Sequence, residues 1–276
     1  MRTALHTFFF WAYLIVCLPL FFVPALAIFL ITFPFDRNGR VLHLFTCFWC
    51  GQHVWMNPFW RLDVQGKENV DRSKAYVYTS NHLSSGDIAV LFTLFLPFKF
   101  VSKHQNFWAP FIGWNMYLNR YVRLVRGDSD SVKTMMGTCR AWLTRGVSIM
   151  MFPEGTRSRS GQLLPFRAGA FKLAMDAGVP VVPIVLDGTF EALPTNGLLR
   201  QNRVLTIRVR ICKPVETKDF ADTKALSEAV RARMEETQKE LWKLRGFTPA
   251  SSAAEPSTPR PAAPMGRKRG GEQIQA

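Results

Sequence analysis

The first sixty residues are dominated by hydrophobic positions that fall into two stretches. No residue between His6 and Asp36 is charged, and the run from Phe8 to Phe33 is apolar at almost every position. About 20 apolar residues suffice for a helix to cross a bilayer core, so this run is long enough. The stretch from Val41 to Trp60 is again rich in Phe and Trp. The pattern predicts a membrane anchor over residues 1–60, made of one span or a helix hairpin plus an amphipathic helix.

The form of this anchor has alternatives. Ala25-Leu26-Ala27 resembles the cleavage site of a secretory signal peptide. However, the apolar run continues past that site to Phe33 and is longer than the hydrophobic region of a signal peptide, which favours retention in the membrane. Pro19 and Pro24 interrupt helical hydrogen bonding. A kinked span and a shallow hairpin therefore both stay open.

From Arg61 onward, short apolar runs alternate with amphipathic stretches. The strand-like runs are 75–78, 98–101, 147–152, 181–186 and 204–211, and the helix-like stretches are 129–145, 166–177 and 224–243. In the last strand-like run, apolar and polar residues alternate as is typical of an edge strand. Strands that alternate with helices predict an α/β fold, a layered sheet with flanking helices, over residues 61–246.

Charge and composition narrow the range of functions. Lys and Arg number 35 against 20 Asp and Glu, for a formal net charge of +15. Such an excess indicates an anionic partner, which is nucleic acid, a phospholipid surface or a phosphorylated small molecule. Five cysteines without regular spacing suit a reducing compartment. After Gly246 the chain turns to Pro, Ala and Ser with a basic GRKRGG stretch, which predicts a disordered basic tail over residues 247–276.

Several common signatures are absent from the chain. It has no GxGxxG, P-loop, HExxH or GxSxG motif, so nucleotide binding, zinc proteolysis and α/β-hydrolase chemistry lack sequence support. Cys47 and Cys50 form a CxxC pair within an apolar stretch and without a second pair. This setting favours core or membrane-embedded cysteines over a metal or redox site.

The first candidate for chemistry is the segment Asn81 to Asp87, directly after the strand-like run 75–78. Active sites of open α/β sheets lie in loops that leave strand ends. His82 has a side chain whose pKa suits removal of a proton from a hydroxyl near neutral pH. Asp87 can accept a hydrogen bond from the other ring nitrogen and so fix the tautomer. Taken alone, this pair is also compatible with a structural histidine.

The second candidate is the charged turn Phe152 to Arg159, again after an apolar strand. Gly155 allows close approach of the backbone, Thr156 offers a hydroxyl, and Arg157 can hold a phosphate through two N–H bonds. The alternative is a capped turn with a surface pair of arginines.

The middle of the chain is strongly basic. Residues 99–172 carry twelve Lys and Arg but three acids, and Arg120, Arg123 and Arg126 fall close together. Such a patch can hold a domain on anionic lipid or bind a phosphate. Of these side chains we expect Arg120 and Arg157 to contact the phosphate.

Four blocks of the sequence carry a family resemblance. They are His82-x4-Asp87, Gly113 to Arg120, Phe152 to Arg157 and Val179 to Ile184, and they occur in the order of the motif blocks of the glycerolipid acyltransferase family. Over roughly residues 61–215 the chain resembles most its 1-acylglycerol-3-phosphate O-acyltransferase (lysophosphatidic acid acyltransferase) branch. Relatives often have an acid before the arginine of the second block, where this chain has Asn119.

The resemblance implies acyl transfer from acyl-CoA or acyl carrier protein to the free hydroxyl of 1-acylglycerol 3-phosphate (lysophosphatidic acid), which gives phosphatidic acid in phospholipid biosynthesis. His82 would be the general base and Asp87 its orienting partner. The acceptor site would consist of Arg120, Glu154, Gly155, Thr156 and Arg157, while residues 179–184 would line the core or an acyl pocket. The resemblance implies neither a metal nor an organic cofactor.

Membrane phospholipid is a further expected partner, and nucleic acid is not expected. Both donors are cytoplasmic, so the catalytic domain is expected to face the cytoplasm from the cell inner membrane. Two groups of alternatives remain. One is an acyltransferase that acts on another lysophospholipid or on glycerol 3-phosphate, or a lipid hydrolase. The other is a membrane-tethered binder of nucleic acid or of an anionic surface, whose affinity for nucleic acid would fall steeply with salt.

Overall fold

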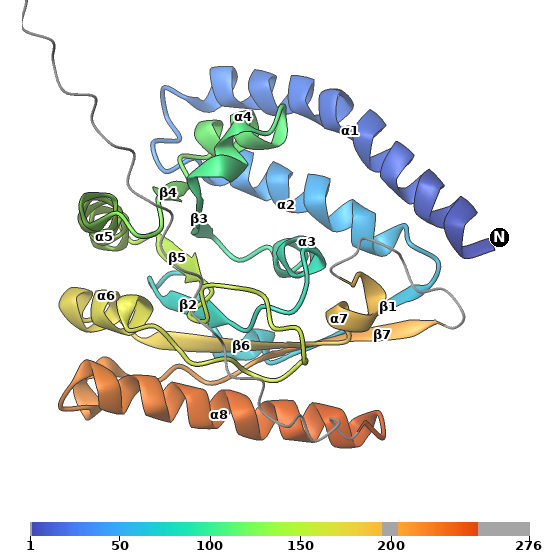
Figure 1. Cartoon of the computed structure of the whole chain (residues 1–276). Helices are drawn as coiled ribbons and strands as arrows, with labels where there is room; N and C mark the ends of the chain where they lie inside the picture. Colours follow the sequence, from blue (N-terminus) through green and yellow to red (C-terminus); the bar gives the residue numbers. More distant parts are fainter. Residues whose placement is uncertain (1, 195–203, 248–276) are drawn as a thin grey trace, which may run out of the picture.

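A seven-stranded sheet between two groups of helices forms the body of the molecule (Figure 1). The structure is a computed structural model and describes residues 2–194 and 204–247. It confirms the predicted α/β class, with helices that flank the sheet and an apolar helix that precedes it. The predicted tail over 247–276 lies outside the described residues apart from Phe247.

The elements have the following bounds. The α-helices are α1 (Arg2–Thr32), α2 (Arg40–Trp55), α3 (Gly86–Phe92), α4 (Ile112–Leu118), α5 (Ser129–Thr144), α6 (Gly169–Ala177), α7 (Thr189–Ala192) and α8 (Thr223–Leu244), with short 3-10 turns η1 (Lys67–Asn69), η2 (His104–Trp108) and η3 (Thr217–Asp219). The strands are β1 (Trp60–Gln65), β2 (Val77–Ser80), β3 (Phe98–Lys103), β4 (Val122–Leu124), β5 (Ser148–Met151), β6 (Val181–Asp187) and β7 (Leu205–Ile211).

The strands lie in the order β1-β7-β6-β2-β5-β3-β4. β2 is parallel to both of its neighbours, β5 and β6, and β3 is parallel to β5 and β4. β7 is antiparallel to β6, and β1 pairs parallel with β7. Because β2 and β5 are parallel neighbours, the loops that follow them leave the sheet at the same edge.

The sheet is buried on both faces. Tyr76 and Tyr78 point to a core shared with α2 and α3, whereas Val77 points to a second core shared with α5, α6 and α8. β6 is buried along its whole length, as expected for a central strand that is covered on both sides. Figure 1 shows α8 below the sheet, and α2 and α3 above it.

α1 is one continuous helix although it contains Pro19 and Pro24, so the shallow hairpin within residues 8–33 is not adopted. Over Thr7–Thr32 it is long and apolar enough to cross a membrane. In the most apolar part of that segment 11% of the residues are buried inside the molecule, so this helix is not a core helix of the sheet domain. Length, composition and exposure thus agree with membrane association.

α2 packs one of its faces against the rest of the molecule. Its side chains Cys47 and Val54 belong to the core between α2, α3 and the sheet. Leu42 and Trp49 pack with α1. One face of the helix thus packs inside the molecule and links α1 to the sheet domain, whereas Val41, Leu44, Phe48 and Trp55 are exposed. The membrane contact of this stretch stays a prediction.

Other elements also differ from the sequence-based expectation. The prediction that 204–211 forms an edge strand is wrong, because β7 lies between β1 and β6. The alternation arises because β7 has one face on the core and the other partly open, with Ile207, Val209 and Ile211 buried.

The helix expected over 129–145 is present as α5. Asp128 caps it by accepting hydrogen bonds from the backbone N–H groups of Asp130 and Ser131.

Candidate active site

The loops after β2 and β5 meet at one edge of the sheet. Thr79 pairs with Met151 near the ends of the two strands, so His82 and Phe152 leave the sheet side by side. Their rings stack with centroids 4.1 Å apart and planes 17° from parallel. The loop between β5 and α6 then passes beneath α3 in Figure 1, and the backbone N–H of Ser158 donates to the carbonyl of His82 at 2.7 Å.

His82 and Asp87 are brought together as the sequence predicts. Nδ1 of His82 lies 2.8 Å from Oδ2 of Asp87. The backbone N–H groups of Leu83 and Ser84 donate to the same oxygen at 2.6 and 2.8 Å. Because Oδ2 of Asp87 already accepts these two N–H groups, it also accepts from His82, so Nδ1 of His82 carries the ring hydrogen. Nε2 is then unprotonated and can accept a proton. The tautomer follows from this hydrogen-bond network.

Burial separates the two members of this pair. The side chain of Asp87 is fully buried in the first turn of α3, whereas that of His82 is 17% exposed. Oδ1 of Asp87 has no hydrogen-bond partner among the described residues. Asp87 can therefore orient His82 and stabilise its charged form but cannot itself reach a substrate. His82 is the member of the pair that presents an atom to the outside.

Glu154 joins the two loops. Oε1 accepts the backbone N–H of His82 at 2.9 Å, and Oε2 accepts the backbone N–H of Leu164 at 3.1 Å. The residue is 3% exposed, and burial raises the pKa of its carboxyl to about 7 although the two backbone hydrogen bonds act in the opposite direction. The sequence assigns Glu154 to the binding of the acceptor. In the structure both carboxyl oxygens are used to position the loop that carries His82.

We expect Glu154→Gln to lower the stability of the protein. The amide keeps the size of the side chain but replaces one acceptor oxygen with an NH₂ group, so the N–H of either His82 or Leu164 loses its partner. An unsatisfied buried donor costs about 1–3 kcal/mol. Thermal unfolding of the detergent-solubilised chain measures this, with Glu68→Gln as a control because Glu68 is an exposed glutamate in η1. An unchanged melting temperature would contradict the positioning role.

Gly155 allows the turn that follows Glu154. Its φ of +68° lies in the left-handed region that favours glycine. A Cβ atom at this position would lie 2.7 Å from Nε of Arg167, so the absence of a side chain lets that guanidinium cross the turn. Thr156 and Arg157, the next two residues, are exposed. The predicted turn thus places Arg157 at the surface, one residue before Ser158, whose backbone contacts His82, and brings in Arg167 from the loop before α6.

Four basic side chains from three segments lie close enough at this edge of the sheet for their charges to repel one another. The charge of Arg126, then partial burial and the charge of Arg157, lower the pKa of Lys103. Burial and then the charge of Arg167 lower the pKa of Arg126. Within the described residues, none of the four forms an ion pair with a carboxylate. This group, the cationic cluster, is Lys103, Arg126, Arg157 and Arg167.

The comparisons with known proteins agree on one family. The family model described as Acyltransferase matches residues 61–187. A chloroplastic 1-acyl-sn-glycerol-3-phosphate acyltransferase of Brassica napus is 42% identical over 185 residues, which cover 66% of this chain and 52% of the relative. A 1-acyl-sn-glycerol-3-phosphate acyltransferase of Limnanthes douglasii is 31% identical, with 74% of this chain and 73% of the relative covered. The chain belongs to the acyltransferase family.

A solved structure supports the fold assignment. The crystal structure of the 1-acyl-sn-glycerophosphate (LPA) acyltransferase PlsC from Thermotoga maritima superposes with a TM-score of 0.69 and 22% identity, covering 87% of this chain and 97% of that one. The resemblance read from the four sequence blocks is thereby confirmed at the level of family and fold. The chain spans about half the length of the Brassica relative.

Arg120, one of the predicted site residues, does not lie in the cationic cluster. It precedes β4, in which Val122 pairs with Val101 of β3. Arg120 therefore lies toward the N-terminal ends of the parallel strands, whereas His82 and Glu154 follow C-terminal ends. Its guanidinium donates to the backbone carbonyl of Arg37 at 2.6 Å.

The arginines of the segment 120–126 lie at different ends of β4. β4 runs from the N-terminal ends of the parallel strands to their C-terminal ends. Arg120 precedes this strand, whereas Arg126 follows it and lies beside Arg167. The sequence singled out Arg120 from the group Arg120, Arg123 and Arg126, whereas in the structure Arg126 is the member that lies in the cationic cluster. Lys103 and Arg167 were missed because neither lies in a block with a chemical pattern of its own.

The fourth block, Val179 to Ile184, runs into β6. Its residues from Val181 onward are fully buried between the two cores of the sheet, so the block supports the strand beside β2. Asn81 is fixed to this strand through both ends of its amide, because Nδ2 donates to the carbonyl of Leu186 at 2.9 Å and Oδ1 accepts its N–H at 2.8 Å. The residue before His82 is thus held rigidly.

Proposed function

We propose that the chain transfers an acyl group from a thioester to the free hydroxyl of 1-acylglycerol 3-phosphate and so forms phosphatidic acid. The observation that carries this proposal is the position of the His82–Asp87 pair beside the cationic cluster. A base that can take a proton from an alcohol and a group of unpaired cations that can hold a phosphate are the two requirements of such an acceptor. The relatives named above have the same activity in their names.

The residues divide the work as follows. Nε2 of His82 takes the proton of the acceptor hydroxyl while the oxygen attacks the thioester carbonyl carbon. Asp87 holds the tautomer and stabilises the imidazolium that forms. The bond between the carbonyl carbon and sulfur then breaks, and the proton on His82 neutralises the leaving thiolate. Arg126 and Arg157 bind the phosphate of the acceptor, together with Lys103 and Arg167.

Thr156 and Gly155 support the acceptor site in this proposal. Thr156 is exposed next to Arg157 and offers a hydroxyl to the same ligand. Gly155 leaves room for the guanidinium of Arg167. Glu154 does not contact the acceptor in this proposal, because its carboxylate accepts hydrogen bonds from the backbone of the two loops.

The membrane arrangement is part of the proposal. α1 anchors the chain, in accordance with its exposed apolar surface, and residues 61–246 form the catalytic domain on the cytoplasmic side of the inner membrane. Both classes of donor, acyl-CoA and acyl carrier protein, are found there. A membrane anchor suits a lysolipid acceptor that is itself dissolved in the bilayer.

A thiol-release assay tests this function. The full chain in membranes is incubated with acyl-CoA, with and without lysophosphatidic acid, and the free thiol is measured. We expect release that depends on lysophosphatidic acid and yields phosphatidic acid. Release without any acceptor would indicate a hydrolase, and faster turnover with another lysophospholipid or glycerol 3-phosphate would indicate a different acceptor. No turnover combined with salt-sensitive binding of nucleic acid would favour the binder alternative.

A further inference from the structure

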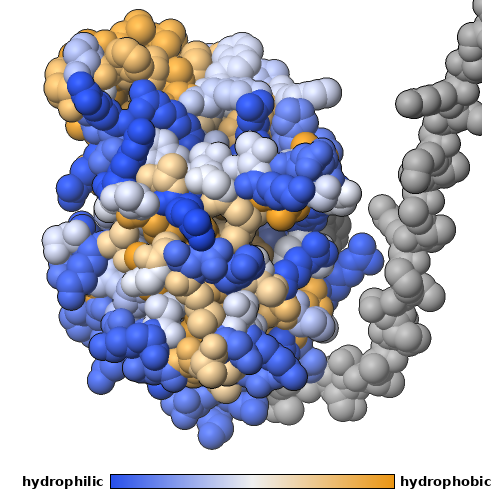
Figure 2. Space-filling view, turned by 90° about the vertical axis from the view of Figure 1, so that its left-hand side faces the viewer, coloured by the Kyte–Doolittle hydropathy of each residue, from blue (hydrophilic) through white to orange (hydrophobic). Residues whose placement is uncertain are grey.

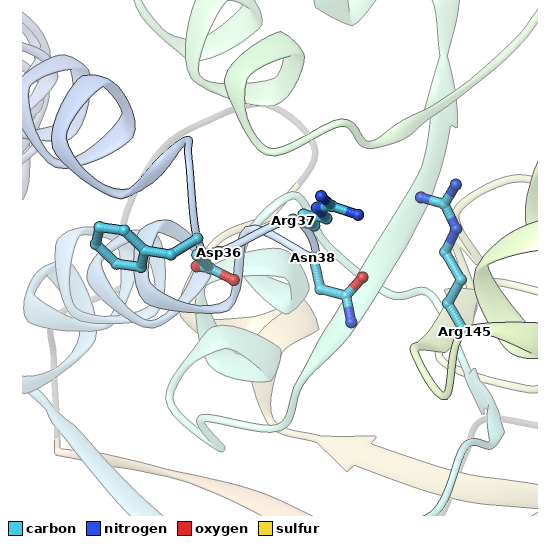
Figure 3. A pocket seen from close by; sticks show the side chains of 5 residues that line it. Asp36, Arg37, Asn38 and Arg145 are labelled. Carbon is cyan, nitrogen blue, oxygen red and sulfur yellow. The ribbon is translucent and has the colours of Figure 1, made fainter.

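A second group of basic side chains surrounds a cleft between the α1–α2 turn and the end of α5 (Figure 3). The cleft has a volume of about 550 Å³ and is lined by Phe35, Asp36, Arg37, Asn38 and Arg145. In Figure 3 the guanidinium groups of Arg37 and Arg145 stand on either side of the same open space. Both side chains are exposed to solvent.

This cleft is separate from the candidate active site. Arg145 follows α5 and precedes β5, while His82 and Glu154 follow the C-terminal ends of β2 and β5. Because the two strands are parallel neighbours, the cleft and the His82 site lie at opposite edges of the sheet. No residue that lines the cleft belongs to the cationic cluster.

Two more cations stand behind the lining residues. The guanidinium of Arg120 donates to the backbone carbonyl of Arg37 at 2.6 Å. The buried amine of Lys99 lies 5.1 Å from the centre of the Trp142 ring, and the guanidinium of Arg145 lies 5.4 Å from the same centre. Lys99 and Arg145 thus share one aromatic contact, which places the amine next to the cleft.

The one acidic side chain that lines the cleft, Asp36, balances only part of these charges. Asp36 accepts the backbone N–H of Val41 at 2.7 Å and so caps the start of α2. Within the described residues, neither Arg37, Arg120, Arg145 nor Lys99 forms an ion pair with a carboxylate. Four basic side chains and one carboxylate give the cleft a positive electrostatic potential, which suits an anion.

Lys99 is the buried member of the four. Its side chain is 1% exposed, and its amine donates to the carbonyl of Asn119 at 2.8 Å. Burial and then the charge of Arg120 lower the pKa of this amine to about 7, although the charge of Asp36 acts in the opposite direction. A buried ammonium that forms no ion pair is costly, and an anion in the adjoining cleft would offset part of that cost. A Cβ atom on Gly39 would lie 3.4 Å from Nζ, so the glycine keeps the turn close to the amine.

The rim of the cleft is apolar on the side of α1. Phe35 lines the cleft and is 70% exposed, and Phe33 is 54% exposed. Figure 2 faces the side of the molecule with the α1–α2 turn and shows an apolar surface at the top that is bordered by a hydrophilic band. Cations at the end of an apolar helix that can span a membrane occupy the level at which lipid headgroups lie.

We propose that this cleft binds the phosphate group of an acidic phospholipid in the surrounding membrane. Arg37 and Arg145 contact the phosphate from two sides, and arginine is suited to this because its planar group forms paired hydrogen bonds with phosphate oxygens. Lys99 and Arg120 add charge from behind. The aromatic rings of Phe33 and Phe35 pack beside the start of the acyl chains. The bound lipid fixes the α1–α2 turn, and with it the sheet domain, at the membrane surface.

Lipid binding to the full chain in detergent micelles tests the proposal. Native mass spectrometry measures the fraction of protein that retains phosphatidylglycerol or, for comparison, phosphatidylcholine. Both lipids carry a phosphate, but the choline cation of phosphatidylcholine offsets its charge and is repelled by the basic side chains of the cleft. We expect the wild-type chain to retain phosphatidylglycerol about tenfold more tightly than phosphatidylcholine, a factor that one charge-assisted contact can supply. Arg37→Gln combined with Arg145→Gln should abolish the preference, and Arg145→Gln alone should weaken it.

The matched control is Lys133→Gln combined with Lys224→Gln, which removes two charges from exposed positions of α5 and α8. This control and His82→Ala should keep the preference, whether or not the proposed acyl transfer is correct. An unchanged preference in the Arg37/Arg145 variant, with an unchanged melting temperature, would overturn the proposal. Millimolar inorganic phosphate that displaces the lipid completely would assign the cleft to a soluble phosphate compound and would overturn the lipid assignment.

Discussion

His82→Ala is expected to lower the rate of acyl transfer at least a hundredfold. A glycerol hydroxyl is a poor nucleophile at neutral pH, and general base catalysis contributes about 10²–10⁴-fold. The variant should keep its fold, because the side chain of His82 is partly exposed and its backbone contacts to Glu154 and Ser158 do not depend on the ring. Turnover with saturating acyl-CoA and lysophosphatidic acid measures the effect.

Asp87→Asn tests the same unit from its buried side. Oδ2 of Asp87 accepts from Nδ1 of His82 and from the backbone of Leu83 and Ser84. An amide has one oxygen and no negative charge, so it holds these donors less well and no longer stabilises an imidazolium. We expect a severe loss of turnover, and the double variant should be little worse than His82→Ala alone, because residues that act as one unit are not additive.

The control for both variants is His104→Ala, which removes a histidine of η2 whose ring contacts Trp108. It should retain turnover close to that of the wild-type chain. Two results would refute the general-base role of His82: near-normal turnover by His82→Ala, or a covalent acyl-enzyme trapped after incubation with the donor alone.

The helices and buried strands of the second half of the chain could be predicted because their patterns are local. α5, for example, repeats apolar residues on one face and begins at Asp128, whose side chain accepts two backbone N–H groups. β6 is a continuous apolar run because both of its faces are covered. The position of β7 between β1 and β6 could not be predicted, since one partly open face gives the same alternation in a central strand as in an edge strand.

The candidate site was predictable where chemistry and local spacing coincide. His82 and Asp87 are five residues apart and meet because α3 begins between them. The cationic cluster could not be predicted as a group from the sequence. Its four members come from three separate segments, which the parallel order of β3, β5 and their neighbours brings to one edge of the sheet. Charge density in the segment 120–126 indicated an anion site, but the strand between Arg120 and Arg126 decides which of them reaches it.

Arg126→Lys and Arg157→Lys should each weaken the use of lysophosphatidic acid by ten- to hundredfold. Lysine keeps the charge but lacks the planar group that forms two parallel hydrogen bonds with a phosphate. A hydrogen bond to a charged group contributes about 1.5–3 kcal/mol, which corresponds to this range. The loss should appear as a higher KM for lysophosphatidic acid when initial rates are measured at fixed acyl-CoA. Replacement with alanine should be more damaging, because the charge is lost as well.

The matched control is Arg123→Lys. Arg123 belongs to β4, three residues before Arg126, and its guanidinium lies 5.4 Å from the centre of the exposed Tyr117 ring. It should leave the KM nearly unchanged. The decisive comparison uses a monoacylglycerol, which offers the same hydroxyl without a phosphate. If Arg126 and Arg157 bind the phosphate, the slow turnover of this acceptor should be equal in the wild-type chain and in both variants. An equal fractional loss with both acceptors would instead show that the two arginines support the loops around His82 and do not bind the phosphate.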